Sequence, residues 1–64
     1  QLTVFGKDIG KRLIALDRPQ VWLIDQVRQR TGHYFDDSYL YKIKPGQLST
    51  QKIVQAIRDI LDIQ

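Results

Sequence analysis

Residues 20–46 read QVWLIDQVRQRTGHYFDDSYLYKIKPG and decide the fold of this chain. Residues 19–30 carry apolar side chains at helical spacing, and Gly32 follows as a left-handed stop. Asp36 then suits the N-cap of a second helix over residues 37–44, which a Pro-Gly pair ends. The stretch therefore predicts two helices joined by a short turn.

A helix is also predicted before this stretch. Within residues 4–16 the apolar side chains recur at spacings of four, four and three, at Phe5, Ile9, Leu13 and Leu16. This spacing places them on one face of a helix, for which Thr3 is the expected N-cap. Asp17 is the expected N-cap of the next helix, which tolerates Pro in its first turn.

The remaining apolar positions predict which sides of the other helices are buried. In the helix over residues 37–44, Leu40 and Ile43 form the buried stripe. The last helix follows the expected caps at positions 49–50, and its stripe comprises Ile53, Val54, Ile57, Ile60 and Leu61. No alternating strand pattern competes. We therefore expect one all-α domain over residues 1–64, a compact bundle of four or five short helices.

The composition excludes several classes of protein. The chain has 64 residues and no Cys, so no disulfide braces it, and its only histidine, His33, is too little for a zinc site. No apolar run approaches the roughly 20 residues that span a bilayer. Without a Cys nucleophile or a glycine-rich phosphate loop, we expect no enzyme, no catalytic residue, no metal and no cofactor. Because the chain begins at Gln1 rather than Met, we expect a trimmed form.

The basic residues are unevenly distributed along the chain. Ten Lys and Arg against seven Asp give a net charge of +3 and a pI near 9.5, which is compatible with a polyanionic partner. Residues 1–35 hold six Lys and Arg against three Asp, whereas residues 36–64 hold four of each. The positive excess therefore lies before the helix predicted over residues 37–44.

The outward side of that helix has two interpretations. Two helices joined by a short turn containing glycine are typical of the DNA-binding helix-turn-helix, whose second helix enters the major groove. The outward set offers hydroxyl, ammonium and carboxylate groups, at Asp37, Ser38, Tyr41, Lys42 and Lys44. An ordinary solvated helix face explains the same residues, so geometry alone leaves both interpretations open.

The order and spacing of these residues resemble the Xre-type phage repressor/Cro family. That family reads Gln-x-x-Leu-Ala, then Gly, then Ser-x-Ser-Tyr-Leu-x-x-Ile-x-x-Gly. The matching positions here are Gln20, Leu23, Ile24, Gly32, Ser38, Tyr39, Leu40, Ile43 and Gly46. Residues 5–14 and 52–61 resemble the family's first helix and the helix that follows the motif. The resemblance covers nearly the whole chain and implies a lambda-repressor-like helix-turn-helix domain.

Two departures from the family pattern matter. Val27 and Ser38 are eleven positions apart, an insertion of roughly six residues relative to the family pattern. Because residues 28–30 continue the helical pattern, we interpret the excess as an extended second helix, with a longer turn as the alternative. In addition, Asp36 and Asp37 stand where the family has Ser or Thr and a polar residue. Carboxylates repel phosphates, unless one of them accepts a hydrogen bond from cytosine N4.

The resemblance implies a role for each matching position. The base-facing positions are Asp37, Ser38, Tyr41 and Lys42. The phosphate-contacting positions are Gln20 and Asp36. From charge alone we add phosphate contacts at Arg28, Arg30 and Lys44. We assign Trp22 to the core or to a dimer contact rather than to DNA.

The resemblance implies a sequence-specific double-stranded DNA-binding transcriptional regulator, a repressor or Cro-like protein of phage or mobile-element type. It implies a cytoplasmic protein of a bacterial or phage-infected cell. We expect a homodimer across two half-sites, with a seam at Ile60, Leu61 and Ile63. A related alternative is an excision or architectural factor of a mobile element, which bends DNA. An alternative from another class is a protein-interaction module that docks a partner through Tyr34, Phe35, Tyr39 and Tyr41.

Overall fold

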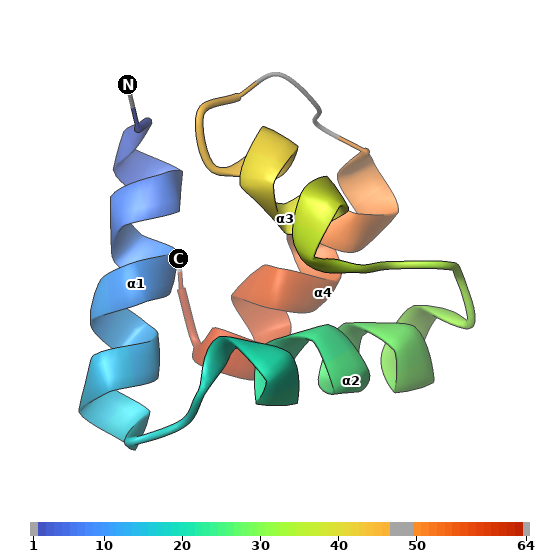
Figure 1. Ribbon diagram of the computed structural model, residues 1–64, viewed down its shortest axis with the longest axis horizontal. Coiled ribbons are helices and arrows are strands. Elements are labelled where there is room, and N and C mark those ends of the chain that lie inside the picture. The colour runs from blue at the N-terminus through green and yellow to red at the C-terminus, as the bar shows by residue number, and fades with distance from the viewer. Residues whose placement is uncertain (1, 47–49, 64) are drawn as a thin grey trace.

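The computed structural model describes residues 2–46 and 50–63, in which the chain forms four α-helices (Figure 1). They are α1 (Val4–Leu16), α2 (Gln20–Thr31), α3 (Asp37–Ile43) and α4 (Gln51–Leu61). The same residues contain no strand, so the predicted all-α class is confirmed. The bounds predicted for the first helix match, and those of the next two differ by at most one residue at either end.

The helices are arranged around α2. In Figure 1, α1 stands at one side, α2 runs away from the lower end of α1 along the bottom of the view, and both α3 and α4 lie above α2. Residues 32–36 leave the far end of α2 and turn back before α3 begins. None of these four helices combines the length and the apolar character that crossing a bilayer requires.

The core draws side chains from all four helices and from the linker between α2 and α3. Phe35, in that linker, is the largest fully buried side chain of the described residues. The helices contribute Ile9 and Leu13, then Leu23, Ile24 and Val27, then Leu40 and Ile43, and finally Ile53, Ala56, Ile57 and Leu61. Since each fully buried Leu, Ile or Phe contributes about 1.5–3 kcal/mol of transfer free energy, this cluster is the main stabilising force. The predicted stripes of α3 and α4 are largely confirmed.

The predicted helix ends are confirmed at three positions. The Thr3 side chain accepts from the Gly6 N–H (3.1 Å), and the Asp36 side chain accepts from the Tyr39 N–H (2.9 Å). Gly32 ends α2 with a φ of 70°, in the left-handed region. At the start of α4, Thr50 has an extended backbone but makes no side-chain cap bond, while Ser49 lies outside the described residues.

The expected role of Asp17 was wrong. It ends α1 instead of capping α2: its φ is 55°, and its N–H donates to the Ile14 carbonyl (3.1 Å). Pro19, with an extended backbone, takes the N-cap position of α2. Aspartate suits both the extended N-cap conformation and the left-handed end of a helix, so local preference does not separate the two. The path of the chain from α1 into α2 decides between them.

The predicted apolar face of α1 was also wrong in one residue. Ile9 and Leu13 are buried as expected, but Leu16 remains 39% exposed at the end of the helix. The third buried position of α1 is Gly6, which has no side chain to add to an apolar pattern. The contact surface of α1 is therefore shifted toward its N-terminal half.

That shift follows from a close approach between α1 and the end of α3. The Lys44 carbonyl accepts hydrogen bonds from the Thr3 N–H (3.2 Å) and from the Thr3 hydroxyl (2.7 Å). A Cβ on Gly6 would clash with the same carbonyl oxygen and lie 2.9 Å from its carbon. Only glycine at position 6 lets the two backbones meet at this distance.

We predict that Gly6→Ala destabilises the fold by about 1–3 kcal/mol, because the obstacle is backbone and does not move aside like a side chain. Gly10→Ala is the matched control on the same helix. Nothing lies within 4 Å of its added Cβ, so it should stabilise the fold by roughly 0.5–1 kcal/mol through helix propensity. Urea unfolding of both variants measures the difference. Equal effects at the two positions would contradict the close approach.

Candidate functional site

The short helix α3 separates its residues into two sides. Leu40 and Ile43 are buried in the core. The four residues predicted to face bases all lie on the exposed side: Asp37, Ser38, Tyr41 and Lys42. Their side chains make no hydrogen bond or ion pair with any residue in the described ranges. The exposed side of α3 is therefore available to an external partner.

The linker before α3 is braced from α2. The Arg28 Nε donates to the Phe35 carbonyl (2.7 Å), and the Phe35 ring packs beside that of Tyr39, with centroids 5.1 Å apart. As predicted, α2 continues helically past Val27 and ends at Thr31, and residues 32–36 form the linker to α3. Arg28, assigned above to phosphate, thus holds the linker that positions α3.

Asp36 is engaged on both carboxylate oxygens. Its Oδ1 accepts from the Tyr39 N–H (2.9 Å), and its Oδ2 accepts from the Tyr34 hydroxyl. The hydrogen bond from Tyr34, with that from the Tyr39 N–H, lowers the pKa of Asp36. The same bond and the negative charge of Asp36 raise the pKa of Tyr34. Asp36, assigned above to phosphate, therefore caps α3 with its carboxylate already occupied.

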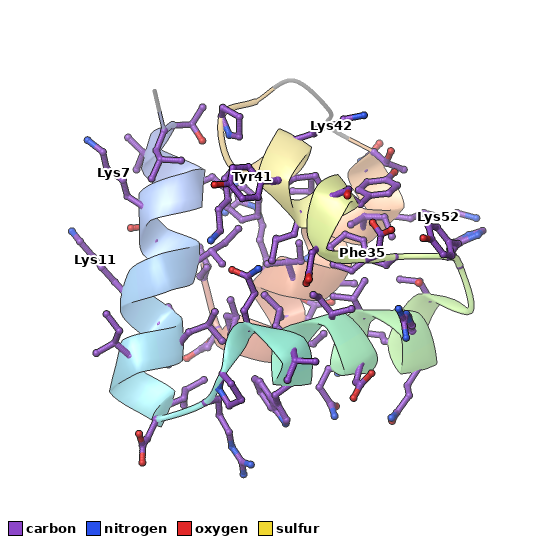
Figure 2. All side chains as sticks on the ribbon, in the orientation of Figure 1. Lys7, Lys11, Phe35, Tyr41, Lys42 and Lys52 are labelled. Atoms are coloured by element: carbon purple, nitrogen blue, oxygen red, sulfur yellow. The ribbon has the colours of Figure 1, made fainter. Side chains whose placement is uncertain are left out.

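Two other residues assigned to phosphate are brought together. The Lys44 Nζ donates to the Gln20 Oε1 (3.1 Å), although 24 positions separate them in the sequence. They line a hollow of about 420 Å³ together with Leu2, Leu40, Tyr41 and Pro45. In Figure 2, Tyr41 lies between α1 and α3. Gln20, Tyr41 and Lys44 thus belong to one surface.

Every arginine is engaged within the fold. Arg12 donates to the Leu61 carbonyl (2.7 Å), Arg28 holds the linker, and Arg30 pairs with Asp59 of α4 (3.8 Å). The guanidinium of Arg18 stacks over Trp22 (5.3 Å), and that of Arg58 over Phe5 (4.6 Å). Arg30, which we assigned to phosphate, thus points to α4, on a different side of α2 from Arg28.

Lysines, by contrast, carry the free positive charge. Lys7, Lys11, Lys42 and Lys52 make no hydrogen bond or ion pair with any described residue. Figure 2 shows Lys7 and Lys11 projecting from α1 at one edge, with Lys42 and Lys52 at the other side of the molecule. Sequence reasoning missed Lys7, Lys11 and Lys52 as candidate partners of an anion, because net charge does not reveal which cations the fold itself uses.

Of the four aromatic residues expected to form the docking surface of a protein-interaction module, only two are exposed. Phe35 is fully buried, and Tyr39 is half-buried, with its hydroxyl 2.6 Å from that of Thr50. Only Tyr34 and Tyr41 of the four are exposed, at 73% and 77%. Trp22 is partly buried against the core, in agreement with its assignment.

The expected dimer seam needs a correction as well. Leu61 is fully buried within one copy of the chain, so it offers nothing to a partner. Ile60 and Ile63 are partly buried and pack against the same core. The apolar excess near the C-terminus is used within the chain because α4 supplies much of the core. The homodimer itself stays a prediction.

We predict that Tyr34→Phe raises the pKa of Asp36 toward its ordinary value, because the main hydrogen bond that lowers it is removed. A carboxyl group whose pKa is lowered by folding stabilises the fold above its unfolded pKa. That contribution is lost as the pH falls through the folded pKa, so the variant should lose it at higher pH. NMR titration of the Asp36 carboxyl carbon measures the shift. Tyr41→Phe is the matched control, and an unchanged pKa in Tyr34→Phe would contradict the contact.

Among residues 2–46 and 50–63, no metal site competes with the surface around α3. The described residues hold no group of three His, Cys, Asp or Glu side chains that could bind a metal ion, and His33 is exposed in the linker. No protein-family model, no curated protein and no solved structure matches the chain. A functional assignment therefore rests on α3 and on the side chains around it.

Proposed function

We propose that the protein is a sequence-specific double-stranded DNA-binding transcriptional regulator, a helix-turn-helix domain like those of the Xre-type phage repressor/Cro family. The observation that carries the proposal is the exposed side of α3. Its four polar or aromatic side chains make no hydrogen bond or ion pair with a described residue, while the opposite side of the same helix is buried. An α-helix fits the major groove of B-DNA, where base edges present hydrogen-bonding groups.

The free side chains of α3 have complementary partners on base edges. The Asp37 carboxylate can accept a hydrogen bond from the cytosine N4 amino group. The Lys42 ammonium can donate to guanine O6 and N7. Ser38 and Tyr41 carry hydroxyls that serve in either sense. With two acids and two bases from Asp36 to Lys44, this segment has no net charge and contributes selectivity rather than general attraction.

Phosphate contacts are proposed for Gln20 and for lysines around α3. Gln20 and Lys44 lie next to Tyr41 on the same surface. In Figure 2, Lys7 and Lys11 project from the side of α1 that faces away from α3, and Lys52 lies on the other side of α3. A phosphate strand borders the major groove on each side, and these lysines are proposed to contact it. In this proposal Arg28 and Asp36 act as positioning residues, since their polar groups already hold the linker and the cap.

A dimer is part of the proposal. A helix of seven residues reaches too few base pairs to select one site in a genome, and helix-turn-helix proteins solve this by binding two half-sites about 10 base pairs apart. Occupying an operator would then block polymerase or a competing regulator. An excision or architectural factor would use the same surface but bend the DNA. The loss of Phe35 and Tyr39 from the surface favours DNA over a protein-interaction module.

Selection from a random duplex pool tests the proposal. We expect a palindromic consensus of two half-sites, bound with an affinity that falls steeply as salt rises. A consensus without symmetry would argue against the dimer alone. If no sequence is enriched, or if affinity is insensitive to salt, the proposed function is wrong.

We predict that Lys42→Gln weakens operator binding and lowers the slope of log affinity against log salt by about one, because one phosphate or base contact of the cation is lost. Lys42→Arg keeps the charge and should keep the slope. Arg30→Gln removes the same charge from a side chain that already pairs with Asp59, so its effect should be smaller. Fluorescence anisotropy at several salt concentrations compares the three variants. An unaltered slope in Lys42→Gln would remove this residue from the interface.

A further inference from the structure

We infer that the hollow beside Tyr41 receives the 5-methyl edge of a thymine, so that recognition depends on a thymine at the base pair opposite this part of α3. The inference rests on the proposed function and specifies what this surface reads. It concerns a cluster of residues from α2, from α3 and from the segments flanking α1 and α3, which no local stretch of sequence brings together.

The hollow has an apolar interior. Leu40 at its floor is fully buried, and Leu2 (46% exposed) and Tyr41 (77% exposed) remain open to a ligand, with Pro45 completing the wall. Its volume of about 420 Å³ admits a methyl group and the adjoining edge of a base without displacing a side chain. An apolar group that fills the hollow removes the exposed apolar side chains around it from water. Because removing apolar surface from water is favourable, an apolar occupant is favoured there.

The side-chain nitrogen groups of the hollow are donors, and the Tyr41 hydroxyl can donate or accept. The Gln20 Oε1 is occupied by the Lys44 ammonium, which leaves the Gln20 amide N–H groups and the remaining Lys44 N–H groups to donate. An occupant therefore needs an acceptor next to an apolar group. In the major groove only thymine presents an acceptor, O4, beside an apolar group, its 5-methyl. Cytosine presents its N4 amino group, a donor, at the position of O4.

The free lysines favour DNA as the occupant. Lys42 on α3 is unpaired within the described residues, and Lys44 adds a positive charge at the hollow itself. A second copy of this surface would oppose like charges across the contact. A phosphate backbone bordering the base satisfies them.

The test replaces thymine by uracil, one position at a time, in the selected operator, which removes only the methyl group. We expect one position in each half-site where uracil lowers affinity roughly three- to fivefold, the effect of one buried methyl. Replacing a cytosine at another position of the operator by 5-methylcytosine should not produce this change in affinity. Tyr41→Ala and Leu2→Ala should each reduce the discrimination between thymine and uracil, whereas Tyr41→Phe, which keeps the ring, should retain it.

Val4→Ala is the matched control, because Val4 is 77% exposed on α1 but does not line the hollow. It should leave the discrimination intact. Sequence-specific binding with no position sensitive to uracil would overturn this inference and leave the proposed function standing. Discrimination that persists in both alanine variants would place the methyl elsewhere and also overturn it. Failure to bind any duplex selectively would instead reject the proposed function, and this inference with it.

Discussion

The carbonyl oxygen of Lys44 is the point on which the arrangement of this small protein depends. It accepts two hydrogen bonds from Thr3 and lies against Gly6, so the start of α1 and the end of α3 meet there. A helix of seven residues is too short to be stable by itself, and its position must be imposed from outside. Arg28 holds its other end through the Phe35 carbonyl. With both ends held, α3 presents one constant side, and the hollow beside Tyr41 exists only because α1 is docked.

The two kinds of basic side chain have different tasks. Each guanidinium holds a carbonyl, a carboxylate or an aromatic ring, which suits a planar group with several fixed donors. The ammonium groups of Lys7, Lys11, Lys42 and Lys52 remain unpaired among the described residues. For a protein proposed to bind DNA, attraction would then come from lysines on both sides of α3. Selectivity would come from the nearly neutral helix between them.

Local sequence signals were sufficient to predict a residue's role wherever its residue type suits a single structural role. Thr3, Gly32 and Asp36 end or begin helices as expected, since each satisfies backbone groups or a left-handed φ at its own position. They were insufficient where one residue type has two uses. Asp17 ends α1 instead of starting α2, and Leu61 fills the core instead of forming a seam between two copies. For Leu61 the deciding neighbours are distant in the sequence, whereas for Asp17 the path of the chain from α1 into α2 decides.

The sequence by itself determined the helices, most of their ends, the all-α class and which side of α3 is exposed, because periodicity and capping act over a few residues. Only the tertiary structure decided which charges are free, that Arg28 holds the linker before α3, and that Leu2, Gln20, Tyr41 and Lys44 surround one hollow. The physical reason is that these properties depend on which surfaces meet. That depends here on a backbone contact at Gly6, where the missing side chain leaves no apolar signal to read.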